Sequence, residues 1–382
     1  MKKILGLILC LTFLFPMVVN ASELAKNATG AILIEVETGT IIFEKNKDEK
    51  YAVASLTKML AQLIILEHIE AGKLSWDEKV TTSANAAGYG GTQIFLQPRE
   101  VMTVRDLFKG VSMASANDAV VVLAERIAGT EAEFVKLMMQ KAKSLGLKNT
   151  NFVNPTGLDE ENHYSTAYDV SVIARALMKH EEIFKYSSIY EDYLRTDTPN
   201  KFWLVNTNKL VRFYEGADGL KTGFTDAAKY CMAVTAKRDG MRLLAIVLGE
   251  EQSKVRNKET AELLDYGFNL YKVDILKKRG ALVKKVKIDK SNLKQVEVVT
   301  EEEVSVLSKK SDTSLKVEEK VEIFDLKTPL KKGDVVGKLK LVSEGKVIGE
   351  YNLIVNQDIK KTSIIRLYFN NIKDIISGGI GF

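Results

Sequence analysis

The sequence predicts an α+β fold, in which helices pack on an antiparallel sheet and a small all-β domain follows. Hairpin-linked strands occur near both ends of residues 22–272, and a series of helical segments separates them. After about residue 273 the helical periodicity gives way to short alternating apolar runs. The 382 residues are enough for two or three domains. We expect a division into residues 1–21, 22–272, 273–358 and 359–382.

The first of these segments has the composition of a secretory signal peptide. Lys2 and Lys3 provide positive charge, residues 4–19 are nearly all apolar, and small residues favour cleavage after Ala21. An uncleaved membrane anchor is the alternative, but the apolar run is short for a spanning helix and contains Pro16. We therefore expect an exported protein of the cell envelope.

Composition and charge exclude several classes of protein. Hydrophobic residues make up 46% and charged residues 27%, which indicates a large core rather than a disordered chain. The net charge of +5 is small and interspersed with acids, so we expect no nucleic-acid partner. After signal removal one cysteine remains, Cys231, which we expect to be a packing residue in a fold without an internal disulfide. The three histidines form no metal-binding pattern, and we expect no metal and no cofactor.

Local patterns predict the elements of the first domain in order. Strands at 31–35 and 40–44 form a hairpin, and a helix at 55–71 ends at Gly72. Further helices are expected at 104–113, 117–128, 131–145 and 165–178. A strand at 219–224 precedes a hairpin of strands at 230–236 and 242–249, and a helix at 259–271 follows.

The remaining chain divides into a β-rich part and an amphipathic end. Strands are expected at 283–288, 296–299, 315–323, 335–342 and 347–355. Within residues 363–377, the isoleucines and aromatic residues fall on one side of a helix and Arg366, Asn370, Lys373 and Asp374 on the other. This segment either docks on the β-domain or lies in the plane of a membrane surface. It has too few consecutive apolar residues to span a membrane.

Three short strings, in order along the chain, describe one active site. They are Ser55-Leu56-Thr57-Lys58, Ser115-Ala116-Asn117 and Lys221-Thr222-Gly223. Residues i and i+3 of a helix point the same way, so Lys58 reaches the hydroxyl of Ser55. A lysine can take the proton of a serine nucleophile only if its pKa is lowered, and burial beside the cation Lys221 lowers it. The helix N-terminus at Ser55 also favours developing negative charge.

The other residues of the strings complete a site for acyl transfer. We expect Ser115 to relay a proton to the leaving group and Asn117 to hold Lys58 and a substrate amide. Lys221 and Thr222 would bind a substrate carboxylate, and Gly223 leaves room for substrate backbone beside the strand. The N–H groups of Ser55 and Phe224 would form the oxyanion hole.

Order and context, rather than any one string, carry this interpretation. Two further S-x-x-K matches begin at Ser291 and Ser343, in the β-rich part where residues i and i+3 do not share a face. Ser83 begins a second S-x-N. The chain has no H-E-x-x-H and no G-x-S-x-G string, and we expect the histidines to be surface or packing residues.

Longer matches around these strings make the chain resemble a known family. They are Ala54-Ser55-Leu56-Thr57-Lys58-Met59, Ala114-Ser115-Ala116-Asn117-Asp118-Ala119, Phe152-Val153-Asn154-Pro155-Thr156-Gly157-Leu158 and Asp218-Gly219-Leu220-Lys221-Thr222-Gly223-Phe224-Thr225. From about residue 27 to 360 the chain is similar to low-molecular-weight penicillin-binding proteins, specifically serine-type D-alanyl-D-alanine carboxypeptidases.

The resemblance implies a fold and an activity. The fold would be a β-lactamase/transpeptidase-like domain, then a β-sandwich domain and an amphipathic anchor at the outer face of the cytoplasmic membrane. Ser55 would attack the D-Ala-D-Ala bond of the peptidoglycan stem pentapeptide, release D-alanine and pass the acyl group to water. β-Lactam antibiotics such as penicillin would acylate the same serine.

Two rival functions and two departures from the family pattern remain. A β-lactamase of this fold would need a water-activating carboxylate, usually in an E-x-x-L-N loop, but Glu191-Asp192-Tyr193-Leu194-Arg195 ends in arginine. A non-catalytic wall-binding or sensor protein would not need the complete set of site residues.

Lys229 stands where relatives often have glycine, and we expect it to narrow or recharge the rim of the cleft. Asn206-Thr207-Asn208 stands where some relatives carry an arginine.

Overall fold

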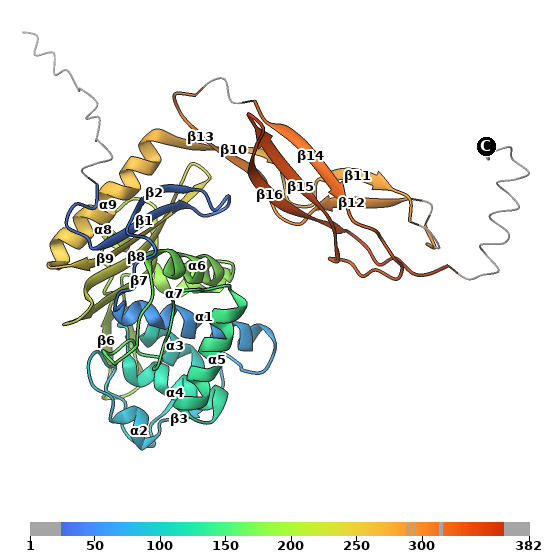
Figure 1. Cartoon of the computed structure of the whole chain (residues 1–382). Helices are drawn as coiled ribbons and strands as arrows, with labels where there is room; N and C mark the ends of the chain where they lie inside the picture. Colours follow the sequence, from blue (N-terminus) through green and yellow to red (C-terminus); the bar gives the residue numbers. More distant parts are fainter. Residues whose placement is uncertain (1–23, 289–290, 294, 313–315, 363–382) are drawn as a thin grey trace, which may run out of the picture.

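The structure is a computed structural model that describes residues 24–288, 291–293, 295–312 and 316–362 (Figure 1). The predicted signal peptide and residues 363–382 of the amphipathic end lie outside the described residues. The α+β class is confirmed, with a mixed helix and sheet domain followed by a β-sandwich-like domain. None of the described helices combines the length and apolar character needed to traverse a bilayer.

A five-stranded antiparallel sheet forms the centre of the first domain. Its strand order is β2-β1-β9-β8-β7. The strands are β1 (Gly30–Glu35), β2 (Ile41–Lys45), β7 (Ala217–Thr225), β8 (Lys229–Arg238) and β9 (Met241–Glu250). Helices cover both faces, so every residue of β1 is buried: Ile32 and Ile34 join the core under α1, and Ala31 and Leu33 join the core under α9. The edge strand β7 carries the Lys221 string.

The helices largely agree with the predicted ranges. They are α1 (Lys58–Glu70), α2 (Ala84–Ala87), α3 (Val104–Met113), α4 (Asn117–Ala128), α5 (Glu131–Ser144), α6 (Ala167–Met178), α7 (Phe184–Ser187), α8 (Leu210–Phe213) and α9 (Ser253–Leu270). The hydroxyls of Thr103, Thr130 and Thr166 cap α3, α5 and α6 by accepting backbone N–H groups of the first turn. The beginning predicted for α9, at residue 259, is wrong, since the helix begins at Ser253.

Two short sheets that the sequence did not predict flank the helices. One pairs β3 (Lys79–Thr81) with β4 (Val101–Thr103), and the other pairs β5 (Glu191–Leu194) with β6 (Phe202–Val205). The β5–β6 hairpin contacts α3, where Lys109 Nζ lies 2.6 Å from Asp192 Oδ2. A long irregular segment between α2 and β4, within the connection of the first of these sheets, carries residues that line the site described below.

The second domain packs two sheets against each other. Its larger sheet has the order β11-β12-β16-β15-β14 and consists of β11 (Leu282–Val286), β12 (Val296–Thr300), β14 (Glu318–Ile323), β15 (Val335–Ser343) and β16 (Lys346–Val355). The smaller sheet pairs β10 (Tyr271–Lys277) with β13 (Val304–Lys309), which were not predicted as strands. Ile359 is fully buried here and pairs with Leu330, and Thr362 is also buried, so Ile359 and Thr362 pack with this domain.

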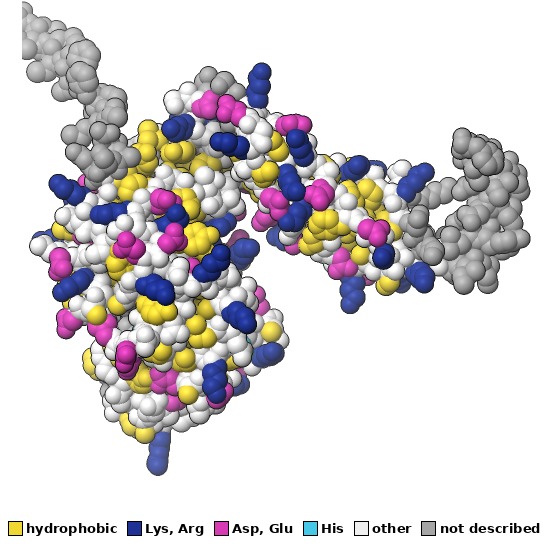
Figure 2. All heavy atoms as spheres, in the orientation of Figure 1, with side chains coloured by type: hydrophobic (Ala, Val, Ile, Leu, Met, Phe, Trp, Pro, Cys, Tyr) yellow, Lys and Arg dark blue, Asp and Glu magenta, His cyan; other side chains and the backbone are white. Residues whose placement is uncertain are grey.

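The two domains join at the C-terminal end of α9. Lys310, which follows β13, donates from its backbone N–H to the Leu270 carbonyl at 2.8 Å and from Nζ to the Phe268 carbonyl at 2.8 Å. The β-domain extends away from the first domain beyond this junction (Figure 1). On the face shown in Figure 2, basic and acidic side chains are interspersed over both domains.

Candidate active site

Ser55 lies in a single 3-10 turn, Ala54–Thr57, that leads directly into α1. Two glycines allow the neighbouring backbones to approach this turn. A Cβ on Gly223 of β7 would lie 3.0 Å from the Ser55 nitrogen, and a Cβ on Gly157 would lie 1.9 Å from the Ala54 carbonyl oxygen. The missing side chain of Gly223 thus makes room for the Ser55 turn, a role that the sequence did not predict, and its predicted role beside a substrate stays a prediction.

Lys58 is fully buried, and its ammonium lies beside the hydroxyl of Ser55. Lys58 Nζ is 2.9 Å from Ser55 Oγ and 2.6 Å from the Thr156 carbonyl oxygen, to which it donates. Burial holds the pKa of Lys58 well below its ordinary value, the charge of Lys221 lowers that pKa further, and the carboxylate of Asp118 opposes both effects. The expectation that Asn117 holds Lys58 is wrong, because the Thr156 carbonyl has that role.

Ser115 and Asn117 lie in the bend between α3 and α4, on the other side of the cleft. Within the part of the chain that the structure describes, Ser115 Oγ and Asn117 Oδ1 are buried and have no hydrogen-bond partner. Asn117 Nδ2 donates to the Gly90 carbonyl at 2.7 Å. A buried polar atom without a partner is unfavourable, so these two oxygens are available for a substrate or a proton.

The strand β7 brings Thr222 to the same cleft and buries Lys221 beside it. Lys221 is fully buried, and its Nζ donates to the Thr222 carbonyl at 3.0 Å. Burial, followed by the charge of Arg256, lowers the pKa of Lys221 to about 7. The Thr222 hydroxyl donates to Thr207 Oγ1 at 2.7 Å. Phe224 is half exposed at the cleft rim, and its ring lies 4.3 Å from that of Tyr230.

Arg256 is a cleft residue that the sequence reasoning missed. It lies in the first turns of α9, a polar stretch without apolar periodicity, which is why the helix was predicted to begin after it. Its side chain is nearly buried, packs toward the Tyr230 ring and donates to Asn257 Oδ1. Burial lowers the pKa of Arg256 only to about 10, so the guanidinium stays charged at neutral pH.

These residues surround one cleft with a volume of about 750 Å³. The lining includes residues from all three strings and, in addition, Gly91, Thr92, Thr207, Lys209 and Arg256. The cleft thus joins a hydroxyl beside a buried lysine of lowered pKa to a cation-rich end, and this arrangement suits acyl transfer on a substrate with a carboxylate.

The family model for D-alanyl-D-alanine carboxypeptidases matches residues 17–252. The chain belongs to the D-alanyl-D-alanine carboxypeptidase family. A second model, the C-terminal domain of penicillin-binding protein 5, matches residues 271–361. The predicted activity of a serine-type carboxypeptidase is confirmed at the level of the family, and the comparisons do not favour a β-lactamase or a non-catalytic protein.

Relatives and solved structures agree with membership of the D-alanyl-D-alanine carboxypeptidase family. The chain is 47% identical to the D-alanyl-D-alanine carboxypeptidase DacF of Bacillus subtilis, over 91% of this chain and 89% of that protein. Penicillin-binding protein 5 of Haemophilus influenzae is 30% identical, with a TM-score of 0.72 over 88% of this chain and 98% of that one. Penicillin-binding protein D2 of Listeria monocytogenes in its ampicillin-bound form is 35% identical, with a TM-score of 0.58 over 64% of this chain and 98% of that one.

The two departures from the carboxypeptidase family pattern have structural explanations. The Lys229 ammonium lies 3.8 Å from Glu251 Oε2, and Lys229 is not among the residues that line the cleft. Asn206 and Asn208 bond to backbone groups, including the Gly219 carbonyl, and thereby brace β7.

His163 is a packing residue, as expected. Its ring stacks on Phe152 at 5.0 Å between centroids, and Nε2 is 2.8 Å from Thr57 Oγ1. Burial lowers the pKa of His163 to about 4, so the ring is neutral at physiological pH.

Proposed function

We propose that this chain removes the terminal D-alanine from peptidoglycan stem pentapeptides through an acyl-enzyme on Ser55. The observation that carries the proposal is the 2.9 Å contact between Ser55 Oγ and the buried Lys58 Nζ. Because burial favours the neutral amine, Lys58 can accept the hydroxyl proton as Ser55 attacks the carbonyl carbon between the two D-alanines. The backbone N–H groups of Ser55 and Phe224 are the proposed donors to the resulting oxyanion.

The second half of the reaction uses the unpartnered groups on the opposite wall. The C–N bond breaks, and the leaving D-alanine nitrogen takes the proton from Lys58 through Ser115 Oγ. Asn117 Oδ1 accepts an amide N–H of the stem peptide and orients it. Water then attacks the acyl carbon while Lys58 takes a proton from it, the Ser55 Oγ–carbon bond breaks, and Lys58 returns the proton to Ser55 Oγ as the shortened peptide leaves with a new terminal carboxyl group. A β-lactam would acylate Ser55 in the same way, but its leaving nitrogen stays tethered, which slows the attack by water.

The cationic end of the cleft is proposed to bind the terminal carboxylate. Thr222 and Arg256 line the cleft there, Lys221 is buried beside Thr222, and a charge-assisted hydrogen bond in a partly desolvated site contributes more than a neutral one. Arg256→Gln should therefore lower kcat/KM for a peptide with a free terminal carboxylate by on the order of tenfold to a hundredfold. Steady-state kinetics on a D-Ala-D-Ala peptide and on its C-terminal amide measure the effect.

The amide peptide separates recognition from folding. If Arg256 binds the carboxylate, the wild type prefers the free acid strongly, whereas Arg256→Gln prefers it weakly. An equal loss on both peptides would instead assign Arg256 a purely structural role. Lys258→Gln is the matched control, because Lys258 lies on the same helix with a largely exposed side chain 3.6 Å from Glu262.

We infer that the enzyme works in the cell envelope, exported by residues 1–21 and attached to the outer face of the cytoplasmic membrane by residues 359–382. The support is the sequence pattern of both ends; because Thr362 is buried, the proposed anchor is taken to comprise the residues after it. An in-plane amphipathic helix binds a bilayer through its apolar face.

Deletion of residues 364–382 should release the mature protein from membranes into the soluble fraction without loss of D-alanine release. Fractionation by sedimentation and an activity assay on both fractions measure this. Ile376→Glu on the apolar side should weaken membrane attachment, whereas Asn370→Glu on the polar side should leave it nearly intact. Continued sedimentation of the truncated protein with membranes would refute the anchor.

A further inference from the structure

The bend that carries Ser115 and Asn117 is held by a segment of irregular backbone, residues 90–97, here called the strap. The carbonyl of Thr92 accepts the N–H of Asn117 at 2.7 Å, and the hydroxyl of Thr92 donates to the Ser115 carbonyl at 2.8 Å. Gly90 accepts the side-chain amide of Asn117 at 2.7 Å. The positions of both residues therefore depend on where the strap lies.

Backbone strain at two points shows that contacts, rather than local preference, impose this arrangement. Ser115 has φ +63° and Phe95 has φ +57°, a left-handed conformation that is unfavourable for residues with a side chain, above all a bulky one. Phe95 is 61% exposed, so burial in the core does not hold it in this conformation. Such conformations persist only where surrounding bonds fix them.

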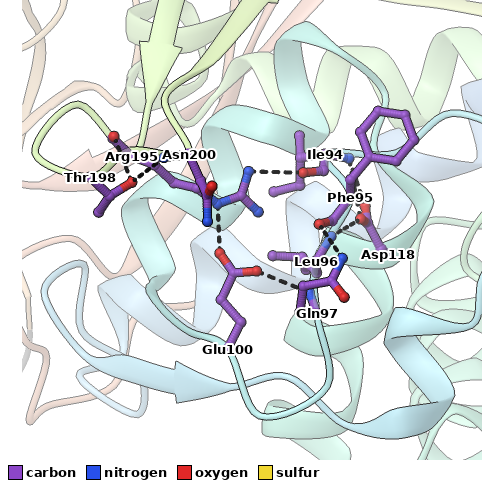
Figure 3. Close-up of polar contacts among 9 residues, drawn as sticks. All are labelled: Ile94, Phe95, Leu96, Gln97, Glu100, Asp118, Arg195, Thr198 and Asn200. Atoms are coloured by element: carbon purple, nitrogen blue, oxygen red, sulfur yellow. Dashed lines mark hydrogen bonds and ion pairs between the residues drawn. The ribbon is translucent and has the colours of Figure 1, made fainter.

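One side of the strap is fixed by Asp118, which is buried. Its carboxylate accepts the N–H of Ile94 at 3.2 Å and the N–H of Leu96 at 3.0 Å, on either side of Phe95 (Figure 3). Asp118 lies on α4, directly after Asn117, so this contact ties the strap to the same helix that it supports.

The other side is fixed by Arg195, which comes from the turn after β5. Arg195 Nη1 donates to the Ile94 carbonyl at 3.0 Å, and Nε donates to Glu100 Oε1 at 2.6 Å (Figure 3). Glu100 Oε2 accepts the N–H of Gln97 at 2.9 Å. The Arg195 side chain is only 11% exposed, so this ion pair is little screened by solvent. The planar guanidinium of Arg195 contacts Glu100 and the Ile94 carbonyl at the same time, and the single ammonium group of a lysine would not reproduce both contacts.

We propose that Arg195 is a positioning residue for the carboxypeptidase reaction, acting through the strap on Ser115 and Asn117. Arg195 touches no part of the cleft, yet it determines the conformation of the segment whose Gly90 and Thr92 hold the proton-relay serine and its neighbouring amide. The inference rests on the proposed function in one respect only, that Ser55 is acylated with the help of Ser115.

The test is the rate at which fluorescent penicillin acylates Ser55 in Arg195→Ala and Arg195→Lys, with saturation kinetics to separate the first-order acylation step from initial binding. Both variants should acylate on the order of tenfold to a hundredfold more slowly, because small displacements of catalytic groups have effects of this size. Initial binding should change less than acylation, since Asn117 is displaced but Lys221, Thr222 and Arg256 are untouched. Arg105→Ala, which removes a partly exposed arginine paired with Asp77, should acylate at the wild-type rate.

A second substitution distinguishes the strap mechanism from general loss of stability. Glycine adopts positive φ without penalty, so Phe95→Gly removes strain that Arg195 otherwise overcomes. Arg195→Ala combined with Phe95→Gly should therefore regain most of the lost acylation rate. A double variant no faster than Arg195→Ala would overturn the proposal, and so would a folded Arg195→Ala protein with the wild-type rate.

Two further measurements keep the outcomes distinct. Glu100→Gln removes the charge that pairs with Arg195 but changes the structure less than Arg195→Ala does. It should also slow acylation, and it is measured in parallel in case the Arg195→Ala protein folds poorly. Wild-type protein that fails to acquire label at Ser55 would overturn the proposed function, whereas labelled wild type with undiminished Arg195 variants would overturn the role of Arg195 alone.

Discussion

Ser55→Ala should abolish both the release of D-alanine from a stem pentapeptide and covalent labelling by fluorescent penicillin. The Ser55 hydroxyl is the only protein group in the proposed reaction that forms a bond to substrate carbon. Lys58, Ser115 and the carboxylate-binding groups move protons or hold the substrate, but none of them can form the acyl-enzyme. Their presence therefore cannot compensate for the loss of the Ser55 hydroxyl. Loss of a serine nucleophile reduces kcat by on the order of 10⁴-fold or more.

Mass spectrometry of the intact protein after incubation with penicillin, together with a D-alanine assay, measures both effects. Ser291→Ala is the matched control, because Ser291 begins another S-x-x-K string but lies in the β-domain, where its hydroxyl accepts the Leu293 N–H. That variant should behave as wild type. Undiminished activity or labelling in Ser55→Ala would refute the acyl-enzyme.

The same substitution at the two buried lysines should have opposite results. Lys58→Arg should reduce D-alanine release by on the order of 10³-fold or more, because a guanidinium stays protonated and cannot accept the Ser55 proton. Lys221→Arg should keep measurable activity, because the role proposed for Lys221 requires a positive charge and a donor rather than a base. Rates for both variants across a range of pH measure the difference.

The pH profile has a defined direction for each lysine. Activity should rise with pH as Lys58 becomes neutral, and it should fall as Lys221, whose pKa is about 7, loses its charge. Bound substrate carboxylate favours charged Lys221, so the alkaline limb of kcat should lie at higher pH than that of kcat/KM. In Lys221→Arg the alkaline limb should disappear. An unchanged limb in that variant would mean that another group produces it.

The sequence predicted the site because its chemistry is concentrated in short strings on regular elements. Ser55 and Lys58 meet within one turn, and Lys221 and Thr222 are adjacent on a strand. Apolar periodicity likewise predicted most of the helices that position them, and in the structure threonine hydroxyls cap three of these helices. Local patterns of this kind need no knowledge of the tertiary structure.

The features that the sequence did not predict all depend on contacts distant in the chain. Arg256 reaches the cleft because the polar first turns of α9 pack beside β8, which periodicity does not indicate. The strap has no periodicity, and its partner Arg195 lies about a hundred residues away. The partner of Lys58 is a carbonyl oxygen of Thr156, a backbone group that no side-chain pattern reveals.

Burial of Lys58 and Lys221 also affects the stability of the folded protein, measured as its free energy of unfolding. In the unfolded chain Lys221 has a pKa near its ordinary value of 10.5, whereas in the folded protein the value is about 7. Between these values the unfolded state binds the proton that the folded state has lost, so the contribution of Lys221 to folding becomes more favourable as pH rises through that interval. Below it, folding must desolvate an ammonium ion beside other cations. The groups that make Ser55 reactive therefore oppose the native state near neutral pH, and the fold must supply the compensating stability from the apolar cores on the two faces of its sheet.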